Sequence, residues 1–326
     1  MGQRSFEKVR KEGSIMAEQD SRQKIVRNTN RLFLVNLCFV TIVSFWLGQK
    51  GVSLSIEMNL IITQLLFWIP IAIYLVITKT NPFHLIPFRR ISLSTILMVT
   101  LFVLLLVPVV SWINLLSMLF VENKVNVIDQ QMTGNTFALN LLVIAVLPAV
   151  SEECMVRGVY FQQYKAGGIL KAAVMSGIVF GFMHLNFNQF SYALILGVIL
   201  ALLVEATGSI FSSIIAHFIF NGQSAAILWM QNHILDPTEK IVLQEVTRAD
   251  IIEMMMAYTM VACIMGVLAF GVFLWIVHHC GSAEHMRQIF SIKRSEHEKK
   301  ASMITPTFII GAAFAIGVMI LLEMIG

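Results

Sequence analysis

The stretch FALNLLVIAVLPAVSEECMVRGVYF, residues 137–161, decides what kind of protein this chain forms. It starts as an uncharged, mainly apolar run, yet Glu152, Glu153 and Arg157 stand inside it rather than beyond its end. An ionisable side chain within a membrane span is costly, and it persists mainly where it faces a cavity and has a partner. The stretch therefore predicts a transmembrane helix that lines a functional site.

The same apolar character extends along the whole sequence. Of the 326 residues, 57% are hydrophobic and 13% are charged, and the mean hydropathy is +0.78. A soluble domain of this length cannot bury so much apolar surface. Uncharged runs near the roughly 20 residues that cross a hydrocarbon core recur along the chain. They begin near Leu32, Asn59, Ser94, Phe137, Ile169, Phe190, Ile210, Met254 and Thr307. We expect an all-α, polytopic transmembrane helix bundle of about nine spans.

Basic residues indicate the orientation, because Lys and Arg near span ends stay on the cytoplasmic side. Residues 1–31 form a basic arm, and the alternate connections farther along hold only Lys50, Lys124, Lys240 and Arg248. We expect a cytoplasmic amino terminus, an arm at 1–31 that touches anionic lipid, and one transmembrane domain at 32–326 with a catalytic core at about 137–226. The acidic segment 232–253 is expected to be an external loop.

The first polar cluster contains two carboxylates with different expected roles. Glu153 and Arg157 are four residues apart with the acid first, which favours an ion pair within one helix. Glu152 points about 140° away from Arg157 around the helix and has no such partner. A buried carboxylate without a cation can accept a proton near neutral pH. Glu152 is therefore the general-base candidate, and Glu153 is the structural one.

Two further clusters lie on later spans. His184 ends the sequence FGFMH at 180–184, and His217 and Asn221 are four residues apart on one helical face. Donors fixed where negative charge develops contribute strongly to acyl-transfer catalysis, and His217 and Asn221 form such a pair. Glu152, His184 and His217 are each twelve or thirteen residues from a flanking charge, so the three clusters share one expected depth. Pro148 is expected to kink the helix beside them, because it cannot donate to the carbonyl of Ile144.

Simpler roles compete with this interpretation. A Glu–Arg pair can be a structural clasp, and a buried histidine can bond two helices. The same clusters would also serve a non-enzymatic membrane scaffold or regulator of a signalling partner, or a proton relay in a transporter. Glu205 is expected to be solvated or to cap its helix, and His278 and His279 are expected to be solvated at the interface. No nucleic-acid partner is indicated.

Taken together and in this order, the motifs Glu-Glu-x-x-x-Arg, Phe-x-x-x-His and His-x-x-x-Asn resemble the CAAX protease and bacteriocin-processing family of intramembrane endopeptidases. The resemblance covers roughly residues 137–226. It implies a hydrolase that cleaves a membrane-associated peptide or protein. By that resemblance Glu152, helped by His184, activates a water, while His217 and Asn221 hold the oxyanion and the Glu153–Arg157 pair supports the fourth span.

Two further expectations depend on the resemblance. The family is often labelled a metalloprotease, and zinc would use Glu152, His184 and His217, a two-histidine, one-carboxylate set. The H-E-x-x-H helix that marks such sites is missing, so we favour a mechanism without a metal cofactor. The layout is similar to that of bacterial members, so a bacterial plasma membrane is the expected location.

Overall fold

The computed structural model describes residues 2–51, 54–121, 132, 134–233, 247–291 and 301–325. Within these ranges all regular secondary structure is helical, which confirms the predicted all-α bundle. Most of the expected external loop at 232–253 lies outside the described residues. Its last part was predicted wrongly, because Thr247 caps a helix that begins at Arg248 and forms a reciprocal capping box with Asp250.

Within the described residues, eight helical segments are long and apolar enough to cross a membrane. They are α1 (Gly2–Gln49, with the candidate span at Met16–Gln49), α2 (Ile56–Ile77), α4 (Leu93–Met118), a composite helix at Phe137–Gly167, α10 (Phe187–Thr207), α11 (Ile210–His233), α12 (Arg248–His279) and α14 (Pro306–Ile325). The chain is therefore a multi-pass membrane protein.

The ninth expected span, beginning at Ile169, is α9 (Ile169–Met183), a helix of only 15 residues. At 1.5 Å per residue it is about 22 Å long, shorter than a hydrocarbon core of roughly 30 Å. Two more short helices, α3 (Pro82–Leu85) and α13 (Ala283–Phe290), lie in connections between the long ones. All nine expected helices thus exist, and eight of them have the length of a full span.

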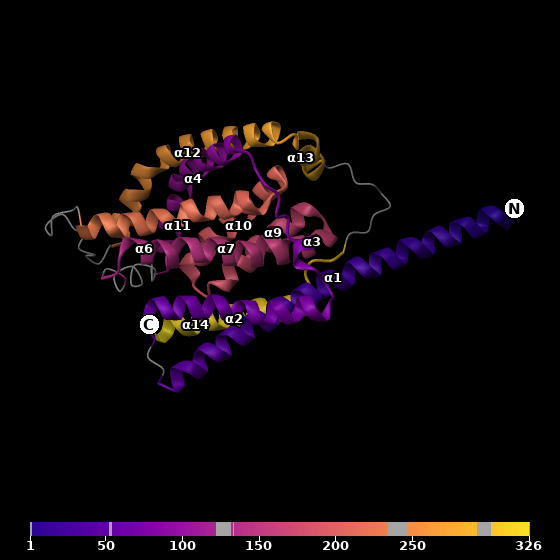
Figure 1. Cartoon of the computed structure of the whole chain (residues 1–326), viewed down its shortest axis with the longest axis horizontal. Coiled ribbons are helices and arrows are strands. Elements are labelled where there is room, and N and C mark those ends of the chain that lie inside the picture. Colours follow the sequence, from indigo (N-terminus) through magenta and orange to yellow (C-terminus); the bar gives the residue numbers. More distant parts are fainter. Residues whose placement is uncertain are drawn as a thin grey trace.

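The helices form three layers (Figure 1). On one side α4 packs along α12, and on the other α1 packs against α2 and α14. Between them lie the composite helix, α9, α10 and α11. The polar clusters predicted from the sequence all fall on this middle layer, at 152–157, at 184 and at 217–221. The two outer layers therefore cover two opposite sides of the layer that holds the clusters.

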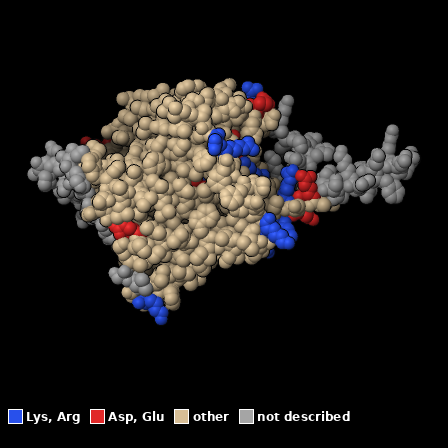
Figure 2. All heavy atoms as spheres, in the orientation of Figure 1, with Lys and Arg blue, Asp and Glu red and all other residues tan. Residues whose placement is uncertain are grey.

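The surface has the charge distribution of a membrane protein. A broad uncharged belt covers the visible face, while Lys and Arg gather toward the end where α3 and α13 lie (Figure 2). Large apolar side chains are exposed on the surface, among them Met260, Val267 and Phe270 on α12. Apolar exposure on this scale is unfavourable in water and is expected of a surface that contacts lipid.

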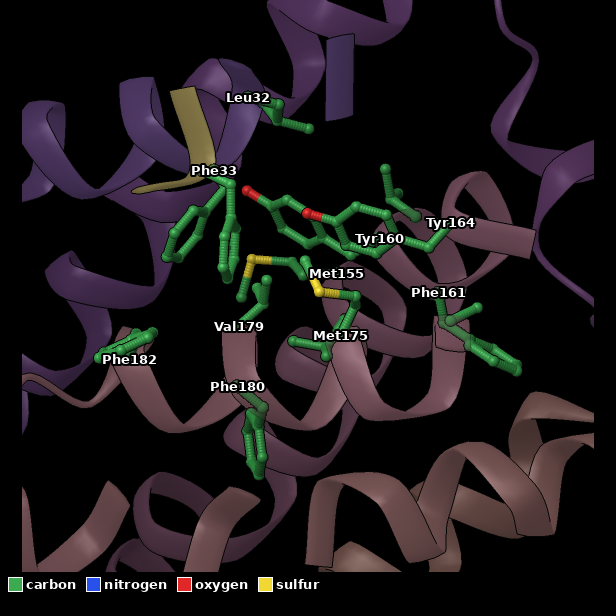
Figure 3. Close-up of a cluster of buried hydrophobic side chains, with 14 of the residues drawn as sticks. Leu32, Phe33, Met155, Tyr160, Phe161, Tyr164, Met175, Val179, Phe180 and Phe182 are labelled. Carbon is green, nitrogen blue, oxygen red and sulfur yellow. The ribbon is translucent and has the colours of Figure 1, made fainter. Parts of the chain in front are cut away.

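The amino-terminal helix is joined to the middle layer by packing and by polar contacts. Phe33 of α1 lies in a buried cluster with Tyr160 and Tyr164 of the composite helix (Figure 3). The Tyr164 hydroxyl donates to Asn30 Oδ1 at 2.7 Å, and Asn36 Nδ2 donates to the Tyr160 hydroxyl at 3.2 Å. Since α1 runs unbroken past residue 31, the expected boundary there between arm and membrane domain stays a prediction.

Candidate active site

The composite helix is not regular around the carboxylates. Its successive parts are α6 (Phe137–Asn140), η1 (Leu141–Val146), α7 (Leu147–Glu153), η2 (Cys154–Tyr160), α8 (Phe161–Tyr164) and η3 (Lys165–Gly167), and both η1 and η2 are wide π-helical turns. Such turns occur frequently at functional sites. The carboxylates of α7 therefore sit between two widened turns, in the region where the sequence predicts a kink.

Pro148 explains one contact with the neighbouring helix. Proline has no N–H, so it cannot donate to the Ile144 carbonyl one turn earlier. Asn221 of α11 uses that carbonyl instead, and its Nδ2 donates to Ile144 O at 3.1 Å. The proline thus leaves an acceptor inside the bundle, and this acceptor holds Asn221 beside the carboxylates.

Glu153 lies at the centre of the polar cluster. Its Oε1 accepts from Arg157 at 2.7 Å, which is the ion pair expected from the sequence, and it also contacts His217 Nδ1 at 2.8 Å. The side chains of Glu153 and Arg157 are both 0% exposed. The Arg157 guanidinium also lies 4.4 Å from the centre of the Phe180 ring. Glu153 therefore joins α7 and η2 to α11 in addition to neutralising Arg157.

The contacts of Asn221 fix the proton of His217. A carbonyl only accepts, so the Asn221 atom facing Ile144 O is the amide nitrogen. The same nitrogen lies 3.1 Å from His217 Nε2, which consequently accepts a hydrogen bond. In neutral His217 the proton is then on Nδ1 and is donated to Glu153. A carboxylate on one ring nitrogen orients an imidazole and stabilises its protonated form.

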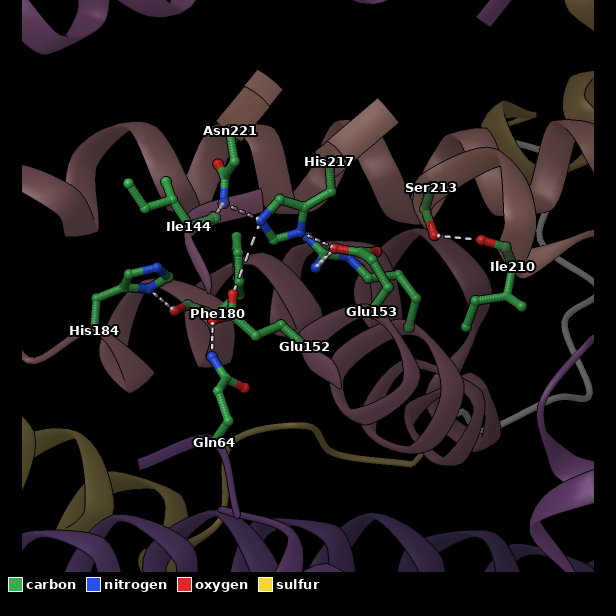
Figure 4. Close-up of polar contacts among 11 residues, drawn as sticks. Gln64, Ile144, Glu152, Glu153, Phe180, His184, Ile210, Ser213, His217 and Asn221 are labelled. Carbon is green, nitrogen blue, oxygen red and sulfur yellow. Dashed lines mark hydrogen bonds and ion pairs between the residues drawn. The ribbon is translucent and has the colours of Figure 1, made fainter. Parts of the chain in front are cut away.

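Glu152 has a different environment from its neighbour. Its side chain is 17% exposed, and Gln64 of α2 donates to Oε1 at 2.6 Å. Its Oε2 lies 4.0 Å from His217 Nε2. Figure 4 shows Gln64 and His217 approaching this carboxylate from opposite sides. No Lys or Arg contacts Glu152 among the described residues.

His184 lies at the edge of the same group, immediately after α9. Its Nδ1 is 2.8 Å from the Phe180 carbonyl, so Nδ1 carries the proton and Nε2 keeps its lone pair in the neutral ring. The Phe180 ring meets His184 edge-on with 4.8 Å between centroids, and it meets His217 likewise with 5.8 Å. All six predicted residues therefore occupy one region, although His184 reaches the others through Phe180.

A comparison with known protein families identifies the same part of the chain. Residues 134–223, which include all six side chains, match the family described as type II CAAX prenyl endopeptidase Rce1-like. The resemblance to the CAAX proteases is confirmed. No curated protein and no solved structure matches the chain. The CAAX-protease-like segment begins three residues before the expected core at 137 and ends three residues before its expected end at 226.

Three functional contacts were missed at the sequence level. Gln64 and Trp68 lie on α2, outside the CAAX-protease-like segment, and Trp68 Nε1 donates to Ser151 Oγ at 2.8 Å. Glutamine in an apolar run gave the only available signal, because Gln64 is polar within a predicted span. The bond from His217 to Glu153 was also missed, since spacing along the chain does not show which of two adjacent carboxylates faces a distant helix.

The side chains as placed do not fit a zinc centre. Among the residues that the structure describes, no group of three or more His, Cys, Asp and Glu is arranged to hold a metal ion. His217 Nε2 accepts from Asn221, and His184 does not join Glu152 and His217 as a third ligand. The step derived below therefore uses only the protein's own groups and a water.

Glu205 differs from its expected state. It was expected to be solvated or to cap its helix, but its side chain is only 7% exposed. It forms an ion pair with Lys165 and contacts His285 Nε2 at 2.8 Å. His279 is exposed, as expected, and its ring contacts Ser94 Oγ at 2.9 Å, which links α12 to α4. Glu205 is therefore a buried link between three segments.

Proposed function

We propose that this protein is an intramembrane endopeptidase that hydrolyses a peptide bond in a membrane-associated protein or peptide. The observation that supports it most is the pair of adjacent carboxylates with different partners. Glu153 is neutralised by Arg157, while Glu152, among the described residues, is hydrogen-bonded only by an amide and faces an imidazole across 4.0 Å. The Rce1-like match supports the reaction class, and the name of that family suggests prenylated CAAX peptides as the substrate class to try first.

In the proposed reaction Glu152 acts as the general base. Its Oε2 takes a proton from a water while the water oxygen forms a bond to the peptide carbonyl carbon. The proton then passes to the leaving amine nitrogen as the C–N bond breaks, which restores the carboxylate. His184 helps to hold the water, because its Nε2 lone pair can accept the second water proton. General-base assistance of this kind contributes roughly 10²- to 10⁴-fold to the rate.

His217 and Asn221 are proposed to stabilise the oxyanion, but only after their resting contacts change. The Asn221 N–H that points at His217 Nε2 is the one available to a substrate oxygen, because the other bonds Ile144 O. His217 donates from Nε2 once it is protonated, with Glu153 accepting from its Nδ1. Once these contacts have changed, both groups would donate to the developing negative charge, and such donors are among the largest catalytic contributions.

The orientation, the location and the absence of a cofactor are parts of the same proposal. The gathering of Lys and Arg at one end supports a cytoplasmic amino terminus, with membrane lipid as the surrounding partner (Figure 2). A bacterial plasma membrane is the proposed site of action. The placement of Glu152, His184 and His217 supports chemistry without a bound metal. Cleavage that survives exhaustive chelation would support this; loss of cleavage that zinc restores would overturn it.

The test is cleavage by purified protein in lipid vesicles. Two substrates are tested. One is a fluorogenic farnesylated CAAX peptide. The other is a membrane proteome that no added protease has digested, in which mass spectrometry counts the new peptide termini. Wild-type protein is expected to produce new termini, and Glu152→Ala and His184→Ala are expected to lose them with unchanged protein abundance. If both variants act like wild type in both assays, the two residues are not catalytic. If the polar cluster instead serves a scaffold, no protein in the series will generate termini.

A further inference from the structure

We propose that Gln64 of α2 is a positioning residue for Glu152, so that the reactive centre extends beyond the CAAX-protease-like segment. This inference rests on the proposed function, because it assigns Gln64 a role in the same reaction. It starts from the short contact between Gln64 Nε2 and Glu152 Oε1 at 2.6 Å. The two residues are 88 positions apart and lie in different layers of the fold.

The direction of the hydrogen bond is settled by chemistry. An ionised carboxylate only accepts, so the Gln64 atom that faces it is the amide nitrogen. This N–H fixes Oε1 and leaves Oε2 facing His217. A donor to the charged form of a carboxylate favours that form, and here it is the only direct hydrogen-bond donor to Glu152 among the described residues. Gln64 therefore controls both the direction of the carboxylate and its readiness to accept a proton.

The rest of α2 is built to hold this amide in place. Trp68, one helical turn after Gln64, donates to Ser151 Oγ at 2.8 Å. Gln64 and Trp68 thus hold two consecutive residues of α7, Ser151 and Glu152, from one face of α2. Trp68 also packs against the buried cluster that includes Cys154. Two such contacts fix the rotation of α2 relative to α7, and that rotation sets where the Gln64 amide lies.

One atom of Gln64 indicates that the amide is kept for more than packing. Its Oε1 is buried and has no hydrogen-bond partner among the described residues. Buried polar atoms are rarely left unsatisfied, so an apolar side chain of the same size would avoid this cost. The other polar atom of the same amide, Gln64 Nε2, donates to Glu152. A positioning role accounts for both observations, because it gives the amide a function that an apolar side chain of the same size could not serve.

The test uses two variants of nearly equal size. Gln64→Met keeps the volume but removes the donor, and Gln64→Glu replaces the donor with a second carboxylate. Cleavage of the farnesylated peptide is measured from pH 5 to 9 in vesicles. Both variants are expected to lose roughly 10- to 100-fold in kcat at neutral pH with little change in KM. The acidic limb of the rate profile is expected to move to higher pH, farther for Gln64→Glu.

A second readout does not depend on activity. Carbodiimide couples an amine to protonated carboxyl groups, so labelling of Glu152, resolved from Glu153 by fragment mass spectrometry, reports its protonation at each pH. The pH of half-labelling is expected to rise in both Gln64 variants and to stay unchanged in Thr63→Ala, the control. Thr63 bonds its own helix at Asn59 O and does not contact Glu152.

The outcomes separate the two proposals. If wild-type protein cleaves nothing, the proposed function fails, yet the labelling experiment still decides the position of Gln64. If the pH of half-labelling is the same in wild type, Gln64→Met and Gln64→Glu, then Gln64 does not control Glu152 and this inference is overturned. A loss of rate with unchanged pH dependence would likewise overturn it, because packing defects lower activity without moving the profile.

Discussion

Two carboxylates in this protein each have a histidine nearby, yet they occupy very different environments. Glu152, in the middle layer, is 17% exposed and lies 4.0 Å from His217 Nε2. Glu205, at the end of α10, is 7% exposed and is paired with Lys165 as well as His285. Glu152 has no Lys or Arg within the described contacts, whereas Glu205 has one.

The difference distinguishes a carboxylate suited to catalysis from one suited to holding helices together. Glu205 already pairs with a lysine and contacts a histidine, so it is suited to tie α10 to η3 and α13. Among the described residues Glu152 is in direct contact with no Lys or Arg, so its carboxylate is the one left available as a proposed general base. Glu153 resembles both carboxylates. It is paired with the cation of Arg157, as Glu205 is with Lys165, and it also orients His217 beside Glu152.

The largest effect is expected from Glu152→Gln. This change keeps the size of the side chain and its contact with Gln64 but removes the base, so kcat for peptide cleavage should fall about 10³-fold. The measurement is initial-rate cleavage in vesicles. Glu205→Gln, with the same chemical change at the paired carboxylate, is the matched control and should stay within about twofold of wild type. Equal losses in both variants would remove the contrast between the two sites.

The next effect concerns stability. Arg157→Met removes the cation from a pair whose two side chains are 0% exposed and leaves Glu153 charged and buried. Removing one partner of such a pair costs about 3 to 5 kcal/mol. Thermal unfolding in detergent should show a large loss, and the double variant Glu153→Gln with Arg157→Met should recover part of it. A single variant no less stable than the double one would contradict the assigned ion pair.

A smaller loss of activity is expected from Asn221→Ala, which removes the hydrogen-bond donor to both Ile144 O and His217 Nε2. Removal of one donor to a developing oxyanion typically costs at least about 10²-fold in kcat. The kcat for cleavage of the farnesylated peptide should therefore fall with little change in KM. Gln223→Ala is the control, because among the described residues Gln223 bonds only its own helix, at Ile219 O. If Gln223→Ala loses as much activity as Asn221→Ala, the loss reflects helix packing.

The sequence predicted the bundle and the contents of its polar cluster for a simple reason. Apolar runs set the spans, and charges inside such runs require partners, so Glu153–Arg157 followed from spacing within one helix. Contacts between helices could not be derived in this way. Gln64 meets Glu152 across 88 residues, and Glu205 meets His285 across 80. The rotation of the helices that carry these residues is set by packing between helices, and the periodicity within one helix does not encode that packing.

The smallest effect is expected at Glu205 itself, where the same Glu205→Gln variant is measured for stability. Its partners Lys165 and His285 are 28% and 47% exposed, so solvent screens both interactions. The loss should be about 1 kcal/mol or less, and it should narrow as salt rises. Unfolding of wild type and variant at low and high ionic strength measures it. A loss that is unaffected by salt would mean that Glu205 acts through burial rather than charge, and its contrast with Glu152 would then need another explanation than the neighbouring lysine.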